Sequence, residues 1–263
     1  MAIETQGFTI VTSGKKRESL TGNATLHLYP HFKKLIKKVP DVFESLTTEV
    51  STSKSKKFSL VNLIDSPGLV DGEMKYPFDI NESILWWANA VDLVFVFFDP
   101  VGQALCKRTL DICEQMADQG FRGKMKFYLS KADEAGHEAD RQRVMMQVVQ
   151  ELCKRPSLNT HSFDMPTIFI PTLSSNKSKC LNQIDLVCKE IDKTINLTIQ
   201  NSLNCLQEDC DVLVENIDKK LEKDSQVLKM NFSRSLRKFG FYSVAVWPLL
   251  FLILRSRFFY IKV

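Results

Sequence analysis

The sequence predicts an α/β domain with a mostly parallel, doubly wound sheet, followed by a helical C-terminal region. Apolar and β-branched segments alternate with segments of helical periodicity along the first part of the chain. The segment Asp92–Phe98 is almost wholly apolar, which is typical of a strand buried on both faces of a parallel sheet. From Ser178 to Lys238 no strand pattern appears and apolar residues recur at helical spacing. We therefore predict a partial α/β domain over residues 1–177, a helical region over residues 178–238 and an apolar tail over residues 239–263.

The individual elements follow from local patterns. The predicted strands are Phe8–Thr12, Phe58–Ile64, Asp92–Phe98, Met125–Leu129 and Thr167–Ile170. The predicted helices are Ile80–Ala90, Gln103–Ala117 and Glu138–Cys153, the first with Asp79 or Asn81 as its cap. Residues 13–57 offer few apolar anchors, and only His31–Lys38 and Pro40–Ser45 are expected to form short helical turns.

Composition indicates a globular protein, and the distribution of charge indicates the kind of partner that it binds. Of the 263 residues, 44% are hydrophobic and 25% charged, which excludes wholesale disorder. The net charge is +4, but residues 219–263 hold ten Lys or Arg against two acids, so this region carries +8 and the rest −4. Such a split indicates an anionic partner for the tail. An anionic membrane surface is favoured over nucleic acid, because a long apolar run interrupts the basic residues.

The cysteines and the N-terminus indicate a cytoplasmic protein. The seven cysteines are odd in number and form no C-x-x-C pair, so we expect reduced thiols and no zinc site. The first residues have neither a basic region nor an apolar core, so no signal peptide is predicted.

The segment Phe239–Leu254 carries no charge and is flanked by basic residues on both sides. As a helix it would reach about 24 Å, short of the roughly 30 Å of a bilayer core, and Pro248 is expected to weaken it. Three interpretations stay open: a buried helix of an appended domain, a membrane-inserted or interfacial anchor, and a non-native tail that follows a truncation.

Two short motifs follow predicted strands, at the edge where open α/β sheets bind ligands. The first is Asp65-Ser66-Pro67-Gly68. An acid there can hold a magnesium ion through water, and glycine allows the backbone to approach a terminal phosphate. The alternative is a plain Pro-Gly turn.

The second motif is Ser130-Lys131-Ala132-Asp133. A carboxylate such as that of Asp133 can accept two hydrogen bonds from guanine, while the stem of Lys131 lies along the base. The alternative is a charged loop. Because a strand, a helix and a further strand separate the two motifs, together they predict one nucleotide site.

On these residues the chain resembles the dynamin superfamily, in particular its EH-domain ATPase and sarcalumenin branch. The similarity lies in the D-S-P-G-L string, the helix with Ile84–Ala88, the strand ending at Phe98-Asp99, and S-K-A-D where the branch usually has N-K-A-D. Upstream, Glu4–Phe8 and Gly22-Asn23-Ala24 are similar to its switch I region and the segment after it. The resemblance covers about residues 3–200.

The resemblance implies a dynamin-type G domain that binds Mg²⁺ with GTP or ATP. Thr5 would ligate magnesium through its hydroxyl, Asp65 would hold a magnesium-bound water, and Gly68 would contact the γ-phosphate. Lys131 and Asp133 would contact the base, and Ser66, Pro67, Ser130 and Ala132 complete the two loops.

The chain departs from the family at the phosphate-binding loop. No G-x-x-x-x-G-K-[ST] string exists, and the nearest, Ser13-Gly14-Lys15-Lys16, lacks both the first glycine and the hydroxyl. Losing three charge-assisted hydrogen bonds would cost about 5 kcal/mol, over a thousandfold in affinity. The family's first strand would be missing too. Leu69 stands where small GTPases carry a water-orienting Gln, so at best weak GTPase or ATPase activity is expected.

Two functions are therefore predicted. The first is a nucleotide-binding dynamin-like or EH-domain-like protein of membrane remodelling or trafficking, with impaired nucleotide binding in this chain. The alternative is a nucleotide-independent remnant of a G domain that serves as an interaction or regulatory module. In both, we expect self-association or association with a full-length relative.

Overall fold

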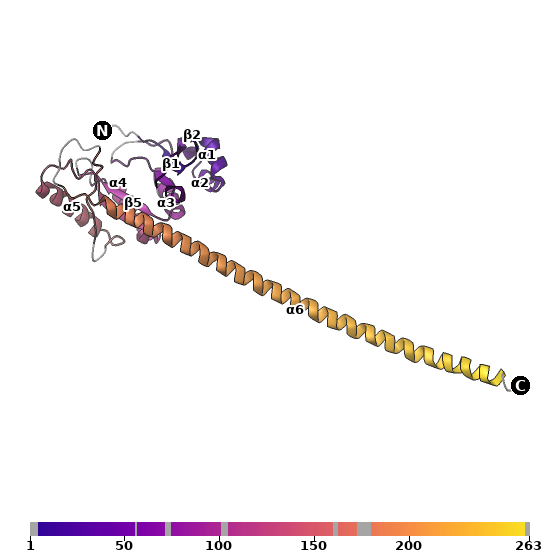
Figure 1. Ribbon diagram of the computed structural model, residues 1–263. Helices are drawn as coiled ribbons and strands as arrows, with labels where there is room; N and C mark the ends of the chain where they lie inside the picture. The colour runs from indigo at the N-terminus through magenta and orange to yellow at the C-terminus, as the bar shows by residue number, and fades with distance from the viewer. Residues whose placement is uncertain are drawn as a thin grey trace. The chain divides into compact units, whose positions relative to one another are not determined.

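The computed structural model describes residues 5–55, 57–71, 75–100, 105–159, 163–172 and 180–260, with side chains up to residue 254 (Figure 1). The chain divides into two compact units, residues 1–198 and residues 199–263, which are described separately.

The first unit contains a four-stranded sheet with the strand order β2-β3-β1-β4. The strands are β1 (Phe8–Ser13), β2 (Glu18–Thr21), β3 (Leu46–Ser51) and β4 (Leu63–Asp65). β1 and β3 are parallel, whereas β2 pairs with β3, and β4 with β1, in the antiparallel sense. The connection from β2 to β3 is helical, through α1 (Gly22–Leu28), η1 (Pro30–Phe32), α2 (Lys33–Lys38) and η2 (Pro40–Ser45). Phe8, Ile10, Leu35, Val42 and Leu46 form the apolar cluster of this sheet.

A second sheet pairs β5 (Val94–Phe98) with β6 (Met125–Leu129) in parallel, from Val94 opposite Met125 to Phe98 opposite Leu129. Around it lie α3 (Ile80–Ala90), α4 (Lys107–Asp118), η4 (Phe121–Lys124) and α5 (Glu138–Cys153). Leu129, Val148 and Leu152, each fully buried, lie in the apolar cluster of this sheet.

Several sequence predictions are confirmed. α3, β6 and α5 have the predicted bounds, and the Asp79 side chain accepts a hydrogen bond of 3.0 Å from the N–H of Glu82, which caps α3. The turns predicted at His31–Lys38 and Pro40–Ser45 are present as parts of η1, α2 and η2.

The prediction of a doubly wound, mostly parallel sheet is wrong. The structure has two small sheets, and the first is mixed. The physical reason is the pairing of β4, which runs antiparallel to β1. Asp65 is therefore the last residue of an edge strand and not of an interior parallel strand. Among the described residues no strand joins β4 to β5.

Two predicted strands also need correction. At Phe58–Ile64, the left-handed φ of 65° at Lys57 starts a 3₁₀ turn, η3 (Phe58–Leu60), so that only Leu63–Asp65 extends as β4. At Thr167–Ile170, one parallel bridge joins Thr167 to Leu129. The Asn182 side chain bonds both the N–H and the C=O of Phe169, at 3.3 and 2.9 Å, and so takes the place of a neighbouring strand.

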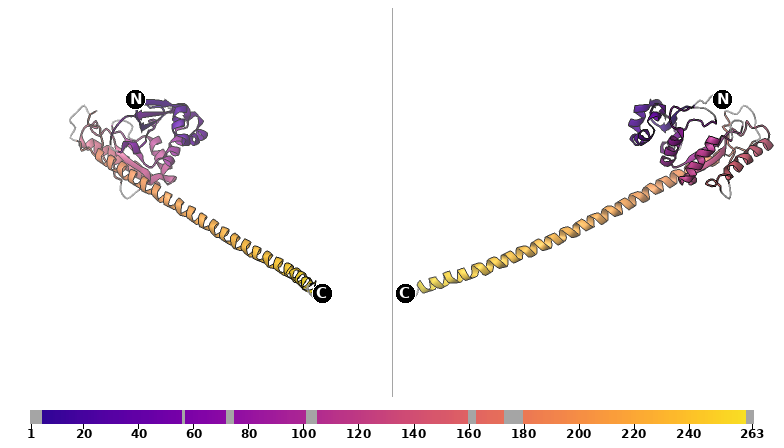
Figure 2. Two further views of the ribbon diagram at one scale, coloured as in Figure 1. Left: turned by 45° about the vertical axis from the view of Figure 1, so that its right-hand side comes forward. Right: turned by 180° about the vertical axis from the view of Figure 1, so that it is seen from behind.

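Helix α6 (Ile184–Tyr260) begins in the first unit and makes up the described part of the second. Its first turns pack on the first unit through the buried Ile195 and an ion pair of 2.8 Å between Asp192 and Lys57. Both views in Figure 2 show one continuous helix, and its bounds include Pro248, so the helix is not interrupted at this proline.

The segment Phe239–Leu254 lies within α6, and its side chains are exposed apart from a half-buried Ser243. The interpretation as a buried helix is therefore wrong for this structure. By length and composition, the helix over Ile184–Leu254 is long and apolar enough to cross a membrane: its most apolar 18-residue window has a mean hydropathy of 1.4, and none of that window is buried.

Candidate functional site

The pairing of β1 with β4 places the predicted metal residues at one end of the first sheet. Thr9 lies opposite Asp65 and Val11 opposite Leu63, so the chain before β1 and the chain after β4 leave the sheet at the same end. Thr5 therefore lies at the end of the sheet where Ser66, Pro67 and Gly68 follow Asp65.

Contacts from three directions hold the loop after β4. Pro67 is buried, and the carbonyl of Gly68 accepts a hydrogen bond of 2.6 Å from the Tyr76 hydroxyl. The Tyr76 ring in turn lies 5.4 Å from the guanidinium carbon of Arg108, a cation–π contact with the first turns of α4. Leu69, the next residue of the loop, packs against the apolar clusters of both sheets.

Asp71 caps α4 from outside that helix. Its carboxylate accepts hydrogen bonds from the N–H groups of Lys107, at 2.8 Å, and Arg108, at 3.0 Å, and from the Cys106 thiol at 3.3 Å. Cys106, at the cap position itself, makes no side-chain cap bond. The backbone N–H groups of Arg108 and Lys107 lower the pKa of the Asp71 carboxyl below its ordinary value, because they stabilise the charged form.

The contact of Asp71 with α4 joins the loop after β4 to the helix that follows β5. Asp71 lies six residues after Asp65, a reach of about 20 Å at most. α4 is the helix that follows β5, and β5 ends beside β6. Asp71 is not among the site residues predicted from the sequence, although an acid three positions after Gly68 was a signal.

The second motif begins where β5 and β6 end together. The N–H of Ser130 donates to the carbonyl of Phe98 at 2.8 Å, and the Ser130 hydroxyl donates to the same carbonyl at 3.2 Å. The next residue after each strand end takes part in an ion pair: the Lys131 ammonium lies 3.0 Å from the Asp99 carboxylate. Lys131 has a left-handed φ of 49°, which is uncommon for a residue with a side chain.

The rest of this turn is anchored through its backbone. The fully buried Ala132 donates its N–H to the carbonyl of Ile168 at 3.3 Å, and Glu134 donates to the carbonyl of Lys131 at 3.0 Å. Asp133 lies half-buried between these two anchored residues. The backbone on both sides of Asp133 is therefore fixed by hydrogen bonds of Ala132 and Glu134.

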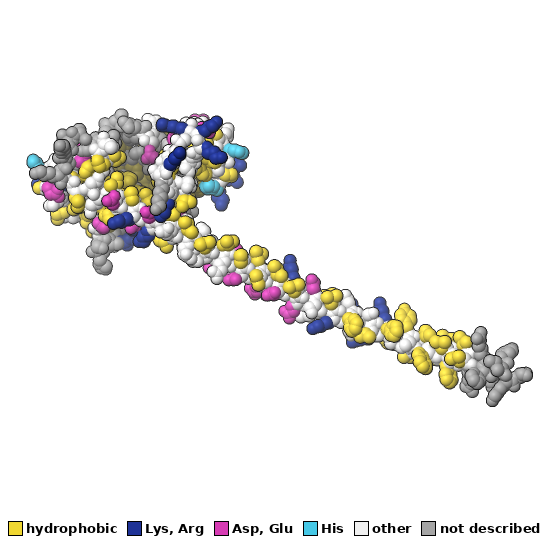
Figure 3. All heavy atoms as spheres, viewed as in Figure 1, with side chains coloured by type: hydrophobic (Ala, Val, Ile, Leu, Met, Phe, Trp, Pro, Cys, Tyr) yellow, Lys and Arg dark blue, Asp and Glu magenta, His cyan; other side chains and the backbone are white. Residues whose placement is uncertain are grey.

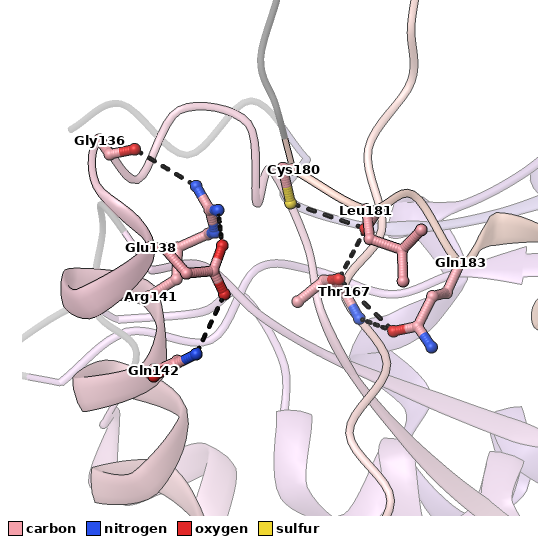
Figure 4. Close-up of polar contacts among 8 residues, drawn as sticks. All are labelled: Gly136, Glu138, Arg141, Gln142, Thr167, Cys180, Leu181 and Gln183. Atoms are coloured by element: carbon pink, nitrogen blue, oxygen red, sulfur yellow. Dashed lines mark hydrogen bonds and ion pairs between the residues drawn. The ribbon is translucent and has the colours of Figure 1, made fainter.

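Figure 4 shows the contacts that brace the segments on either side of this turn. Arg141 of α5, although buried, donates to the carbonyl of Gly136 at 3.2 Å and pairs with Glu138. The segment that receives Ala132 is fixed at Thr167, whose hydroxyl donates to the Leu181 carbonyl at 2.8 Å and whose N–H donates to the Gln183 side chain at 3.1 Å.

Thr5 and Asp65 are the two residues predicted to ligate magnesium. Within the described ranges no group of three or more His, Cys, Asp and Glu side chains is arranged to hold a metal ion. Thr5 and Asp65 are oxygen donors of the kind that magnesium takes, but two of them leave most of its six positions to water and phosphate.

Comparison with known proteins adds one finding. No family model matches the chain, and no curated protein matches it. A solved chain from an oligomerised bacterial dynamin pair, described as providing long-range sensing and tethering of membranes, is similar to this one with a TM-score of 0.45 and 15% identity. The match covers 86% of this chain and 40% of the solved one, so this chain spans less than half of that protein's length.

Proposed function

We propose that this chain is a dynamin-like protein of the EH-domain type that binds a purine nucleotide, GTP or ATP, with Mg²⁺, and that it acts at membranes in remodelling or trafficking. Asp65, Ser66, Pro67 and Gly68 would meet the phosphates and the metal, with Thr5 as the second protein ligand of magnesium. Ser130, Lys131, Ala132 and Asp133 would meet the base.

The Ser130–Asp133 turn is the observation that carries the proposal. Lys131 holds an uncommon left-handed conformation, and Ser130 and Ala132 are bonded to two different neighbouring segments. Strained backbone of this kind costs on the order of 1–3 kcal/mol and is concentrated at ligand sites. A turn built this way fixes the backbone on both sides of Asp133, whose carboxylate would meet the base.

Nucleotide affinity should be low, because the chain has no phosphate-binding loop. The separation of β4 and β5 into two sheets also supports low affinity. A G domain that lacks its first strand would have no strand to join these two sheets. Turnover by this chain alone should be weak at best, and no residue of the two loops is assigned a catalytic role.

One observation favours the alternative, a nucleotide-independent interaction module. Both loops are already held by protein groups: Tyr76 bonds the carbonyl of Gly68, and Asp99 pairs with Lys131. A protein that keeps these loops ordered without a ligand can use them as a binding surface.

The proposal of membrane action rests on α6. Its segment Phe239–Leu254 is free of charge and exposed, and basic residues flank it. Each Lys or Arg close to an anionic surface adds about 1 kcal/mol to membrane binding, so the basic tail would assist the apolar segment.

Equilibrium titration with fluorescent GTP and ATP in the presence of Mg²⁺ tests the nucleotide site. We expect a dissociation constant below about 1 mM, weakened at least about tenfold by Asp133→Ala, because a charge-assisted hydrogen bond contributes about 1.5–3 kcal/mol. Glu134→Ala is the matched control, since it removes the same charge one position away and should leave affinity unchanged. If the wild-type chain binds neither nucleotide at about 1 mM, the module without nucleotide is the correct function.

A further inference from the structure

The second unit presents a long apolar stripe that nothing in the described chain covers. Along α6, exposed apolar residues recur every three or four residues, with one gap of seven, over about 60 Å. They are Ile199, Leu203, Leu206, Cys210, Leu213, Ile217, Leu221, Leu228, Phe232, Leu236 and Phe239. Because the mean spacing stays close to 3.6 residues, these side chains follow one face of a straight helix.

The charges along the same stretch are divided at its midpoint. Residues 199–218 contain five acids and no Lys or Arg, a net charge of −5. Residues 219–239 contain seven Lys or Arg and two acids, a net charge of +5. Figure 3 shows the acidic side chains gathered on the first half of this stretch and basic ones on the second, with hydrophobic side chains continuing through both.

We infer that α6 associates with α6 of a second copy of this chain in antiparallel orientation, through the stripe over residues 199–239. Antiparallel pairing places the acidic half of each helix against the basic half of the other, twice over. Parallel pairing would place −5 against −5 and +5 against +5, and it would oppose Asp224, which interrupts the stripe, to its own copy. The charge pattern thus selects a second copy as the occupant and sets its direction.

In a register centred on Lys219, eight of the eleven stripe residues oppose another stripe residue, and Leu203, Leu213 and Leu236 oppose serines. In that register Ile199 opposes Phe239, Leu206 opposes Phe232, Cys210 opposes Leu228 and Ile217 opposes Leu221. Four apolar layers therefore lie on each side of the twofold axis, eight in all. At two core layers per heptad, these correspond to four heptads, within the range that marks a coiled coil. This inference is independent of nucleotide binding.

Sedimentation equilibrium of the full chain in density-matched detergent micelles tests the association. We expect a dimer whose dissociation constant rises at least about tenfold in Ile217→Glu, because this change puts a charge into the seam. The matched control is Val212→Glu: its side chain is 56% exposed against 54% for Ile217, but it lies about 140° away around the helix. A wild-type monomer at all concentrations, or equal effects of the two variants, overturns the inference.

Native Cys210 reports the orientation. In a full-length background with Cys188→Ser and Cys205→Ser, mild oxidation should not join two copies through Cys210, because antiparallel pairing separates the two thiols. Adding Leu228→Cys should produce a covalent dimer through Cys210 and the introduced thiol, whereas Val227→Cys, which lies about 100° from Leu228 around the helix, should not. A dimer linked through Cys210 in the starting background, or no dimer with Leu228→Cys, contradicts the antiparallel register.

Discussion

The carboxylate of Asp71 and the backbone N–H of Arg108 lie 3.0 Å apart and join the loop after β4 to the first turn of α4. The loop begins at the predicted phosphate motif, and α4 follows the strand that ends beside the predicted base motif. The Asp71 carboxylate thus joins the loop after β4 to the start of the helix that follows β5.

Replacing Asp71 with Asn should lower the free energy of unfolding of the first unit by about 0.5–2 kcal/mol, the usual effect of weakening a helix cap. The amide retains one acceptor but loses the charge that faces the helix N-terminus. Urea denaturation followed by circular dichroism measures this change. Glu134→Gln is the control, because it removes an exposed acid outside the helix cap and should shift unfolding by less than about 0.5 kcal/mol.

The contribution of Asp71 should depend on pH in a defined direction. The pKa of its carboxyl is lower in the folded chain than its ordinary value of 3.8, chiefly because the N–H groups of Arg108 and Lys107 stabilise the anion. Its contribution is therefore complete above the ordinary pKa and is lost as the pH falls through the lowered one. The stability difference between wild type and Asp71→Asn should be constant from pH 7 to about pH 5 and shrink below pH 4. A difference that grows on acidification would contradict the assignment.

The cysteines should differ sharply in their reaction with iodoacetamide. Burial raises the pKa of the Cys113 thiol to about 12, against a smaller opposite effect of Arg155, so almost no thiolate exists at pH 8. Cys205 is exposed on α6 and should react rapidly. Mass spectrometry of the native chain at pH 8 should find Cys205 modified and Cys113 protected, and unfolding in urea should abolish the difference. Rapid modification of native Cys113 would show that the core around α4 opens.

Binding to anionic vesicles should require the segment Phe239–Leu254 and should weaken with salt. Phe251→Glu replaces an exposed apolar side chain by a charge and should reduce co-sedimentation at least about tenfold, since a buried Phe side chain contributes about 1.5–3 kcal/mol. Val212→Glu adds the same charge outside the segment and should have little effect. Pelleting that is unchanged at about 1 M salt would exclude an electrostatic contribution of the basic residues.

The elements that the sequence predicts well are those whose signals are local. α3 carries its own cap at Asp79, and the amphipathic pattern of α5 sets both of its ends. β2 and β3 were missed because they contain several polar residues and are stabilised by pairing between residues about thirty positions apart, as with Ser19 and Glu49. Such pairing leaves no periodic pattern that a single segment reveals.

In the candidate site too, residues marked by a local sequence pattern were predicted, and residues held by distant contacts were missed. The two motifs could be located because each follows an apolar strand. Asp71 and Arg141 were missed, because the partners of Asp71 lie 36 and 37 residues away and arginine is ordinarily assigned to the surface. The position of Arg141 did offer a signal, since it lies seven residues before Val148 and eleven before Leu152, on the buried face of α5.

The packing of Leu69 has a mechanical consequence. This side chain enters the apolar clusters of both sheets, directly after the glycine that the Tyr76 hydroxyl holds. A displacement of the backbone at Gly68 would also move Leu69 away from both apolar clusters. Each cluster would then have to repack to fill the space that Leu69 leaves. Leu69, together with Ile84 of α3, therefore joins the two halves of the first unit, and a displacement of this loop disturbs the packing of both sheets.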